Sequence, residues 1–413
     1  MPTPQPEDFL LAAKHAEVAS LDDISEHLQW VSSGCNVIHQ LQRERGLTNI
    51  WLVSTGQRKN AELTAQRINV EHVIAQFNEG IAPFCSQSDG RLPSALLTAL
   101  AQATLALASL DALRRDIDAQ QRQPLDSTLA YNHMVKQLLA LLAEVAELTR
   151  NPTLAKAIIA LLYLVQMKEK VGQERAWTSI GFARGYFVER LQQRLHHNQS
   201  QQAELLEAFL SNASPEQSAA WQTLAQSNLC QELVQIRQMR DALYSREDND
   251  PGIADPWYEK ITEYIDQLYA LEQLSIKQLA DECCFQRDQA ERERIKIAKQ
   301  LVKLQDQPPE DPMLSGGDSP ATLVLSTPSL HQLISEQSLQ IQHLQADLSR
   351  AKHALQSRKL VERAKDILKG QLKLDDDAAY KQLQQSAMSS GRTLEQVAQR
   401  VVDMLQQKGG ATR

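Results

Sequence analysis

Residues 44–50 read Glu-Arg-Gly-Leu-Thr-Asn-Ile, and 130 positions later residues 174–180 read Glu-Arg-Ala-Trp-Thr-Ser-Ile. Four of the seven positions are identical. Each copy follows a long stretch with apolar residues at helical spacing, so the repeat predicts two related helical bundles that pack together. Chance similarity between helices rich in Gln and Arg is the alternative explanation.

The composition of the 413-residue chain favours helices over its whole length. Aromatic residues make up only 5% of it and glycines number 15, whereas a β-sheet protein of this size normally has more of both. Its five cysteines have no repeating spacing, which argues against a disulfide scaffold and indicates a reducing compartment. The longest strictly apolar run, residues 157–165, is too short to cross a membrane. We therefore expect a soluble, cytoplasmic protein with no membrane partner.

Breaks rich in Gly, Pro and Asn divide residues 21–305 into about eight helices, which predicts two packed four-helix bundles. Residues 1–20 are expected to form an N-terminal tail. Residues 306–328 contain seven Pro and Gly residues among Ser and Asp, which is the composition of a flexible linker. Residues 329–409 are expected to form a coiled-coil helix that leads into a small three-helix module. The predicted fold class is therefore all-α.

The coiled-coil expectation rests on a heptad at the start of the C-terminal region. Apolar residues recur there every seven positions, with further ones three positions on: Ile334, Ile341, Leu344, Leu348, Ala351 and Leu355. Such a stripe is typical of a short coiled-coil seam, which would join two copies of the chain as a homodimer. A helix that packs on its own domain is the alternative.

Arginines in both repeats fall on the stripe that faces the helical core. Arg45 lies on the stripe that begins at Ile24, and Arg175 lies on the stripe that begins at Leu161. Arg237 is a third candidate, on a helix with two competing stripes. A guanidinium group in a helical core needs an anionic partner. A Glu or Asp from a neighbouring helix could supply it, and so could a bound small, planar anion.

The two repeat strings, set in a helical region of about 285 residues, resemble the NIT domain. The resemblance implies a sensor of nitrate and nitrite that is built from two packed four-helix bundles, with the anion held between long helices. On this basis we expect Arg45, Arg175 and Arg237 to bind the anion. Ala176, which replaces the glycine of the first copy, is a departure from the pattern.

The C-terminal region carries boundary signals for three helices. The first continues the heptad helix and ends near Gly370, and the second runs from the acidic residues 375–377 to Gly391. The third opens with Thr393 and Gln396 in capping-box spacing. This end of the chain is also basic: residues 355–413 carry a net charge of +4, and the rest of the chain carries −12. A polyanionic partner would bind here, and the acidic remainder could hold the basic module against itself.

Residues from about 340 to 405 resemble the ANTAR domain, a three-helix RNA-binding module of bacterial transcription antiterminators. Asp366 departs from the family, which usually has Gly there, and places a carboxylate near the expected RNA face. A solvated helical face is the alternative for each basic residue, and a helix-turn-helix that reads DNA would also be small, helical and basic. The residues expected to contact RNA phosphates or bases are Arg358, Arg363, Lys365, Lys369, Arg392 and Arg400.

Signals for catalysis or metal binding are weak. The sequence has no Cys-x-x-Cys pair and no Gly-rich phosphate loop, and His196 and His197 lack a spaced third ligand, so we expect neither an enzyme nor a cofactor. Together the two resemblances imply a nitrate- or nitrite-responsive regulator of transcription antitermination in a nitrate assimilation operon. Its expected partners are the anion and a leader mRNA hairpin. A small-anion-regulated, DNA-binding transcription factor is the alternative.

Overall fold

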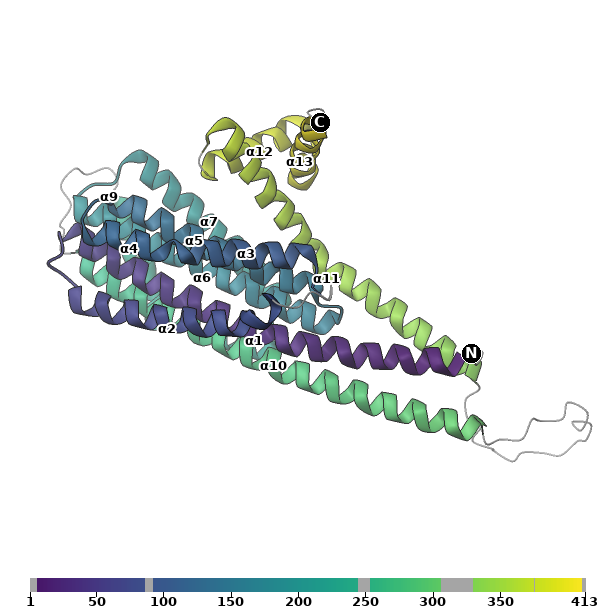
Figure 1. Cartoon of the computed structure of the whole chain (residues 1–413). Coiled ribbons are helices and arrows are strands. Elements are labelled where there is room, and N and C mark those ends of the chain that lie inside the picture. The colour runs from purple at the N-terminus through teal and green to yellow at the C-terminus, as the bar shows by residue number, and fades with distance from the viewer. Residues whose placement is uncertain (1–5, 86–91, 244–252, 306–329, 375, 411–413) are drawn as a thin grey trace, which may run out of the picture.

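The structure, a computed structural model, describes residues 6–85, 92–243, 253–305, 330–374 and 376–410. These residues form helices joined by short turns, and no strand occurs among them. Two helical bundles lie side by side, and a small helical module sits on one flank (Figure 1). The all-α class predicted from the sequence is confirmed.

Residues 6–85 and 92–148 form the first bundle, in which two short consecutive helices take the place of one long helix. Its members are α1 (Pro6–Val53), α2 (Asn60–Cys85), α3 (Ser94–Ala108), α4 (Leu110–Asp118) and α5 (Pro124–Leu148). Helix α1 packs against α2 and α5, and α3 packs against α5. Proline at the first position of α5 costs no hydrogen bond there and presets the helical φ angle.

Residues 152–243 and 253–305 form the second bundle on the same plan. Its members are α6 (Pro152–Arg184), α7 (Glu189–Asn212), α8 (Pro215–Ala225), α9 (Asn228–Leu243) and α10 (Ala254–Gln305). The side chain of Asn151 caps α6 by accepting a hydrogen bond from the Leu154 amide at 3.1 Å. Gly185, with φ at 77°, adopts the left-handed conformation that ends α6.

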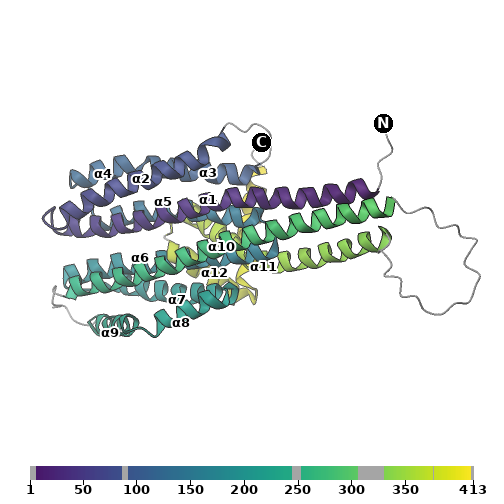
Figure 2. The same ribbon diagram turned by 90° about the horizontal axis from the view of Figure 1, so that it is seen from below.

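The two bundles share one apolar core. Helix α1 lies against α6 and α10, and α5 lies against α6. Seen from below, α1–α5 and α6–α9 occupy opposite halves, with α10 next to α1 (Figure 2). Buried aliphatic and aromatic side chains from both bundles form a single continuous cluster. This arrangement brings the two repeat strings, on α1 and α6, into the middle of the molecule.

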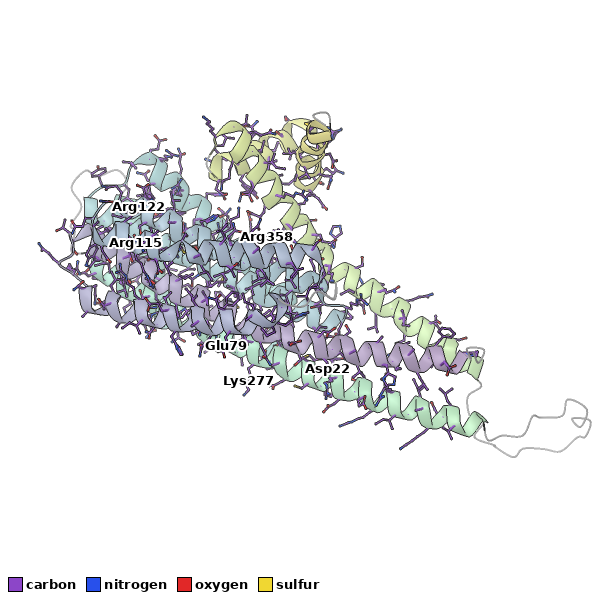
Figure 3. All side chains as sticks on the ribbon, in the orientation of Figure 1. Asp22, Glu79, Arg115, Arg122, Lys277 and Arg358 are labelled. Carbon is purple, nitrogen blue, oxygen red and sulfur yellow. The ribbon has the colours of Figure 1, made fainter. Side chains whose placement is uncertain are left out.

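The N-terminal tail expected for residues 1–20 is wrong for residues 6–20, which form the beginning of α1. This part of α1 runs along α10, and oppositely charged side chains join the two helices. Lys14 Nζ lies 2.9 Å from Glu293 Oε2, and Asp22, labelled in Figure 3, lies 2.5 Å from Arg287 Nε. The segment is helical because it has a partner along its length, which a tail would lack.

Helix α11 (Leu330–Leu372) carries the heptad and is helical along its whole length. Leu355 is buried against the bundles, whereas Ile341 and Leu344 remain 49% and 39% exposed. The helix thus packs on its own chain at one end and presents an unpartnered apolar stripe at the other. The flexible linker expected for residues 306–328 lies outside the described residues.

The three-helix module expected at the C-terminus is confirmed. The end of α11 packs with α12 (Asp376–Ser390) and α13 (Leu394–Gly410) around a small core that includes Ala364, Leu383 and Ala398. Thr393 and Gln396 form the expected capping box, with reciprocal bonds between backbone and side chain of 3.2 Å each.

One stretch of the described residues, Ser94–Asp118, is long and apolar enough to cross a membrane by length and composition. It comprises α3 and α4. Leu96, Leu100 and Leu107 point into the first bundle, and core helices of globular proteins pass the same test. Leu105 is 75% exposed on the outer side of α3.

Candidate functional site

Arg45 on α1 and Arg175 on α6 lie where these two helices cross, and each is only 1% exposed. Glycine makes the close approach possible. A Cβ atom at Gly172 would lie 2.5 Å from Nη2 of Arg45, and one at Gly46 would lie 2.5 Å from Nη2 of Arg175. Each guanidinium group therefore lies against the backbone of the opposite helix.

Arg45 is held at one end of its guanidinium group. Its Nη1 donates to Glu169 Oε1 at 2.6 Å and to Asn132 Oδ1 at 2.5 Å. Within the part of the chain that the structure describes, Nε and Nη2 of Arg45 are buried and have no hydrogen-bond partner. These two nitrogens form the edge that binds planar oxyanions in a bidentate manner.

Arg175 is held in a similar way. Its Nη1 donates to Thr262 Oγ1 at 3.0 Å, and its Nη2 donates to the carbonyl oxygen of Gln42 at 2.7 Å. Its Nε is buried without a partner among the described residues. Burial lowers the pKa of Arg175, the electrostatic interaction with Tyr258 raises it in part, and the charge of Arg45 lowers it further. A bound anion would stabilise the charged form of Arg175 against both the cost of burial and the repulsion from Arg45.

The hydrogen-bond partners of the two arginines lie at equivalent positions of the sequence repeat. Asn132 follows Arg45 by 87 positions, and Thr262 follows Arg175 by 87 positions. The contacts of α1 with α5 are thus reproduced by α6 with α10. The repeat strings thus mark equivalent positions in the two bundles, in line with the prediction that the bundles are related.

A groove of about 570 Å³ opens between α1 and α10 beside this site. Tyr258 and Thr262 line the groove and also contact Arg175, which lies 5.0 Å from the centre of the Tyr258 ring. The groove thus lies next to Arg175, although neither arginine lines it.

The glutamates that precede the two arginines are also buried, and sequence reasoning missed their role. Arg114 Nε and Nη2 donate to the two oxygens of Glu44, both at 2.8 Å. Arg237 holds Glu174 in the same fork, at 2.9 and 2.6 Å. The signal was present, because glutamate is the first residue of both repeat strings. In each bundle, an arginine from another helix neutralises this glutamate: Arg114 pairs with Glu44, and Arg237 pairs with Glu174.

Arg237 therefore does not join Arg45 and Arg175 in the structure. Its guanidinium group binds Glu174, which also accepts a hydrogen bond from Arg240 at 3.0 Å. Burial raises the pKa of Glu174, but the charges and hydrogen bonds of Arg237 and Arg240 outweigh burial and bring it to about 2. This clamp ties α9 to α6 and stabilises the second bundle.

A separate buried ion pair lies about two helical turns before Arg175 on α6. Lys168 Nζ and Glu272 Oε2 are 2.5 Å apart, and both side chains are fully buried. His39 stacks on Tyr269 with ring centres 3.7 Å apart, and burial together with the charge of Lys168 lowers the pKa of His39 to about 2. His39 is therefore neutral, and the charges of Lys168 and Glu272 cancel each other.

The C-terminal module is docked on the bundles through ion pairs. Lys359 Nζ lies 2.7 Å from Glu144 Oε1 on α5, and Asp366 Oδ1 lies 2.6 Å from Lys136 Nζ on the same helix. Arg358, labelled in Figure 3, lies over the ring of Tyr163 on α6 at 5.6 Å.

Comparison with protein families matches residues 36–280, more than half of the chain, to the family described as nitrate and nitrite sensing. The chain belongs to this NIT family. Residues 349–402 match the ANTAR domain. The nitrate regulatory protein of Klebsiella oxytoca is 26% identical over 398 residues, which cover 96% of this chain and 94% of the relative. The structure of the NasR transcription antiterminator covers 97% of this chain and 99% of its own, with 25% identity and a TM-score of 0.63.

The order of NIT and ANTAR domains is thus that of a NasR-type, nitrate-responsive regulator of transcription antitermination. Both families are regulatory, which confirms the prediction that the chain is not an enzyme.

The residues expected to contact RNA divide into two groups in the ANTAR domain. Arg363, Arg392 and Arg400 are exposed. Lys365 is only 2% exposed, with its Nζ between Glu362 and Asp376 at 2.9 and 2.7 Å.

The remaining two residues also have partners within the chain. Lys369 Nζ lies 3.0 Å from Asp376 Oδ1, and Arg358 lies over the ring of Tyr163 in the NIT domain. Lys365, Lys369 and Arg358 thus lie toward α12 or the NIT domain, whereas Arg363 on the same helix faces solvent.

Glu174→Gln is expected to destabilise the chain by about 3 kcal/mol at pH 7, because Arg237 and Arg240 lose a buried carboxylate. The folded-state pKa of Glu174, about 2, lies below its ordinary value of 4.5, so its stabilisation is complete above about pH 4.5 and disappears as the pH falls toward 2. Urea unfolding at several pH values should thus show the wild-type and variant curves converging in acid. The exposed Glu207→Gln on α7 is the control, and a gap that is independent of pH would contradict the clamp.

Proposed function

We propose that nitrate or nitrite binds between α1 and α6 at Arg45 and Arg175. One observation carries this proposal: three buried guanidinium nitrogens, Nε and Nη2 of Arg45 and Nε of Arg175, have no partner among the described residues. Buried donors of this kind cost free energy unless an acceptor meets them. A small planar oxyanion supplies acceptors in the plane of the guanidinium fork.

The arrangement supports a different role for Arg237. Both oxygens of Glu174 already occupy its fork, so an anion there would have to displace a buried carboxylate. We therefore assign Arg45 and Arg175 to direct contact with the anion and Arg237 to the frame that holds α6. The groove beside Tyr258 serves as the route of access.

We propose that the ANTAR domain binds a leader mRNA hairpin in the cytoplasm after it leaves the NIT domain. The docked arrangement supports this order, because Arg358 and Lys359 are engaged with α6 and α5 and are not open to a phosphate backbone. Asp366, the departure from the ANTAR pattern, has a partner on the NIT domain in Lys136. Burial and the charge of Lys365 lower the pKa of Lys170 on α6, which shows how closely the two domains approach.

We also propose that α11 joins two copies of the chain. Ile341 and Leu344 lie on the heptad stripe and expose large apolar side chains in the single chain. Pairing of two such stripes would bury them in a coiled-coil seam. The Leu355 end of the helix, which packs on the NIT domain, would stay in place.

Arg45→Lys is expected to lower the affinity for nitrate at least about tenfold. Lysine keeps the positive charge next to Glu169 but lacks the planar fork that two oxygens of the anion require. Isothermal titration of the full chain measures the effect, with circular dichroism to check helicity. Arg43→Lys is the matched control, because Arg43 lies on the same turn of α1 and is exposed. Equal nitrate affinity in wild type and Arg45→Lys would exclude this site.

Reversal of two charges on α5, by Glu144→Lys and Lys136→Glu, should increase binding of leader RNA in the absence of nitrate by about tenfold. The double variant replaces attraction to Lys359 and Asp366 with repulsion and leaves the RNA-binding domain unaltered. Fluorescence anisotropy with and without nitrate measures the effect, and duplex DNA of the same sequence tests the DNA-binding alternative.

The control for this double variant is Glu232→Lys, which breaks an exposed pair with Lys260 away from the module. If the α5 variant binds RNA as weakly as wild type without nitrate, these contacts do not restrain the ANTAR domain.

Ile341→Asp together with Leu344→Asp should convert dimers to monomers, because a carboxylate at a seam position faces its copy across the axis. Sedimentation velocity measures the change. Leu339→Asp is the control, because Leu339 is exposed on the same helix but off the heptad stripe. A double variant with the oligomeric state of wild type would show that α11 does not join the copies.

A further inference from the structure

The charges at the crossing of α1 and α6 do not balance. Two buried guanidinium groups, Arg45 and Arg175, lie there with one buried carboxylate, Glu169, which pairs with Arg45 and is 4% exposed. Glu169 Oε1 accepts hydrogen bonds from Arg45 at 2.6 Å and from Gln173 at 2.8 Å, and its Oε2 accepts one from Gln42 at 2.9 Å. The carboxylate is therefore fixed by three neutral or cationic donors.

The other buried charged groups near the site have oppositely charged partners. Glu44 pairs with Arg114, and Glu174 pairs with Arg237 and with Arg240, which also pairs with Asp241. Lys168 and Glu272 neutralise each other in the core. Arg43 and Asp266 act on Arg175 with opposite signs, and both are exposed and screened by solvent. The buried site thus has one net positive charge.

A buried net charge is costly, and an ion that cancels it completely is favoured. One monovalent anion makes this site neutral. A divalent anion would leave an uncompensated negative charge in a region of low dielectric constant. We propose that Glu169 makes the site selective for monovalent anions over divalent anions such as sulfate. This inference rests on the proposed anion site at Arg45 and Arg175.

The position of Glu169 fits this role because it does not occupy the binding edge. It shares Nη1 of Arg45 with Asn132, so Nε and Nη2 remain available to the ligand. The carboxylate subtracts one charge from the site without replacing the anion. A carboxylate that occupied the binding edge itself would instead weaken the binding of every anion by the same factor.

The test uses the full-length chain, titrated calorimetrically with nitrate and with sulfate. Glu169→Gln keeps the shape of the side chain and raises the site charge to two. The ratio of the sulfate Kd to the nitrate Kd is expected to fall at least about tenfold in this variant. Asn132→Asp adds a carboxylate beside the same Nη1 in a nearly identical shape and cancels the net charge, so nitrate affinity should fall at least about tenfold.

The double variant, Glu169→Gln with Asn132→Asp, restores one net positive charge with the carboxylate on the other side of Nη1. It should recover the wild-type preference for nitrate. If Glu169→Gln fails to fold, as judged by circular dichroism, Asn132→Asp alone still tests the charge balance of the site.

Three results would overturn the inference. Glu169→Gln could change the affinities for nitrate and sulfate by the same factor. Glu169 would then be only a competitor of the anion or a structural partner of Arg45. Asn132→Asp could bind nitrate as wild type does, or the double variant could fail to recover the preference. A wild-type chain that binds no nitrate would instead refute the anion site itself.

Discussion

A guanidinium group in a helical core must find charge and hydrogen-bond partners inside the protein, and two such groups meet where α1 crosses α6. Gly46 and Gly172 let the helices approach closely enough for each arginine to reach the opposite backbone. Helices α5 and α10 must then supply Asn132 and Thr262 at equivalent places. The packing of both bundles is thereby tied to one crossing, because a shift of either helix would break the hydrogen bonds that hold Nη1 of Arg45 and Nη1 of Arg175.

The sequence predicted the parts of this arrangement that depend on local pattern. Helical phase placed Arg45 and Arg175 in the core, and boundary residues such as Thr393 placed the helices of the ANTAR domain. Phase does not reveal which distant side chain meets a buried arginine, so Glu169 was missed. Burial of Lys365 depends on α12 and on docking to the NIT domain, which no pattern within α11 records.

Helix α6 contributes both to the proposed anion site and to the contact with the ANTAR domain. Glu169 faces Arg45, and the next residue, Lys170, lies within electrostatic reach of Lys365 and Asp376 in the ANTAR domain. A ligand can shift an equilibrium between docked and released forms only if it binds the two forms differently. A small rotation or translation of α6 would change both environments at once, since helices in a packed core move as units.

Residues 130 positions apart occupy equivalent places in the two bundles, but they need not carry the same charge. His39 stands in α1 where Glu169 stands in α6, and His39 is neutral. A pocket on the axis of a symmetric homodimer receives every charged group twice, so its own charge is always even. Two halves fused in one polypeptide can differ at single positions, and here one carboxylate against two arginines leaves an odd charge. Covalent duplication thus permits a centrally placed pocket to match an ion of charge minus one.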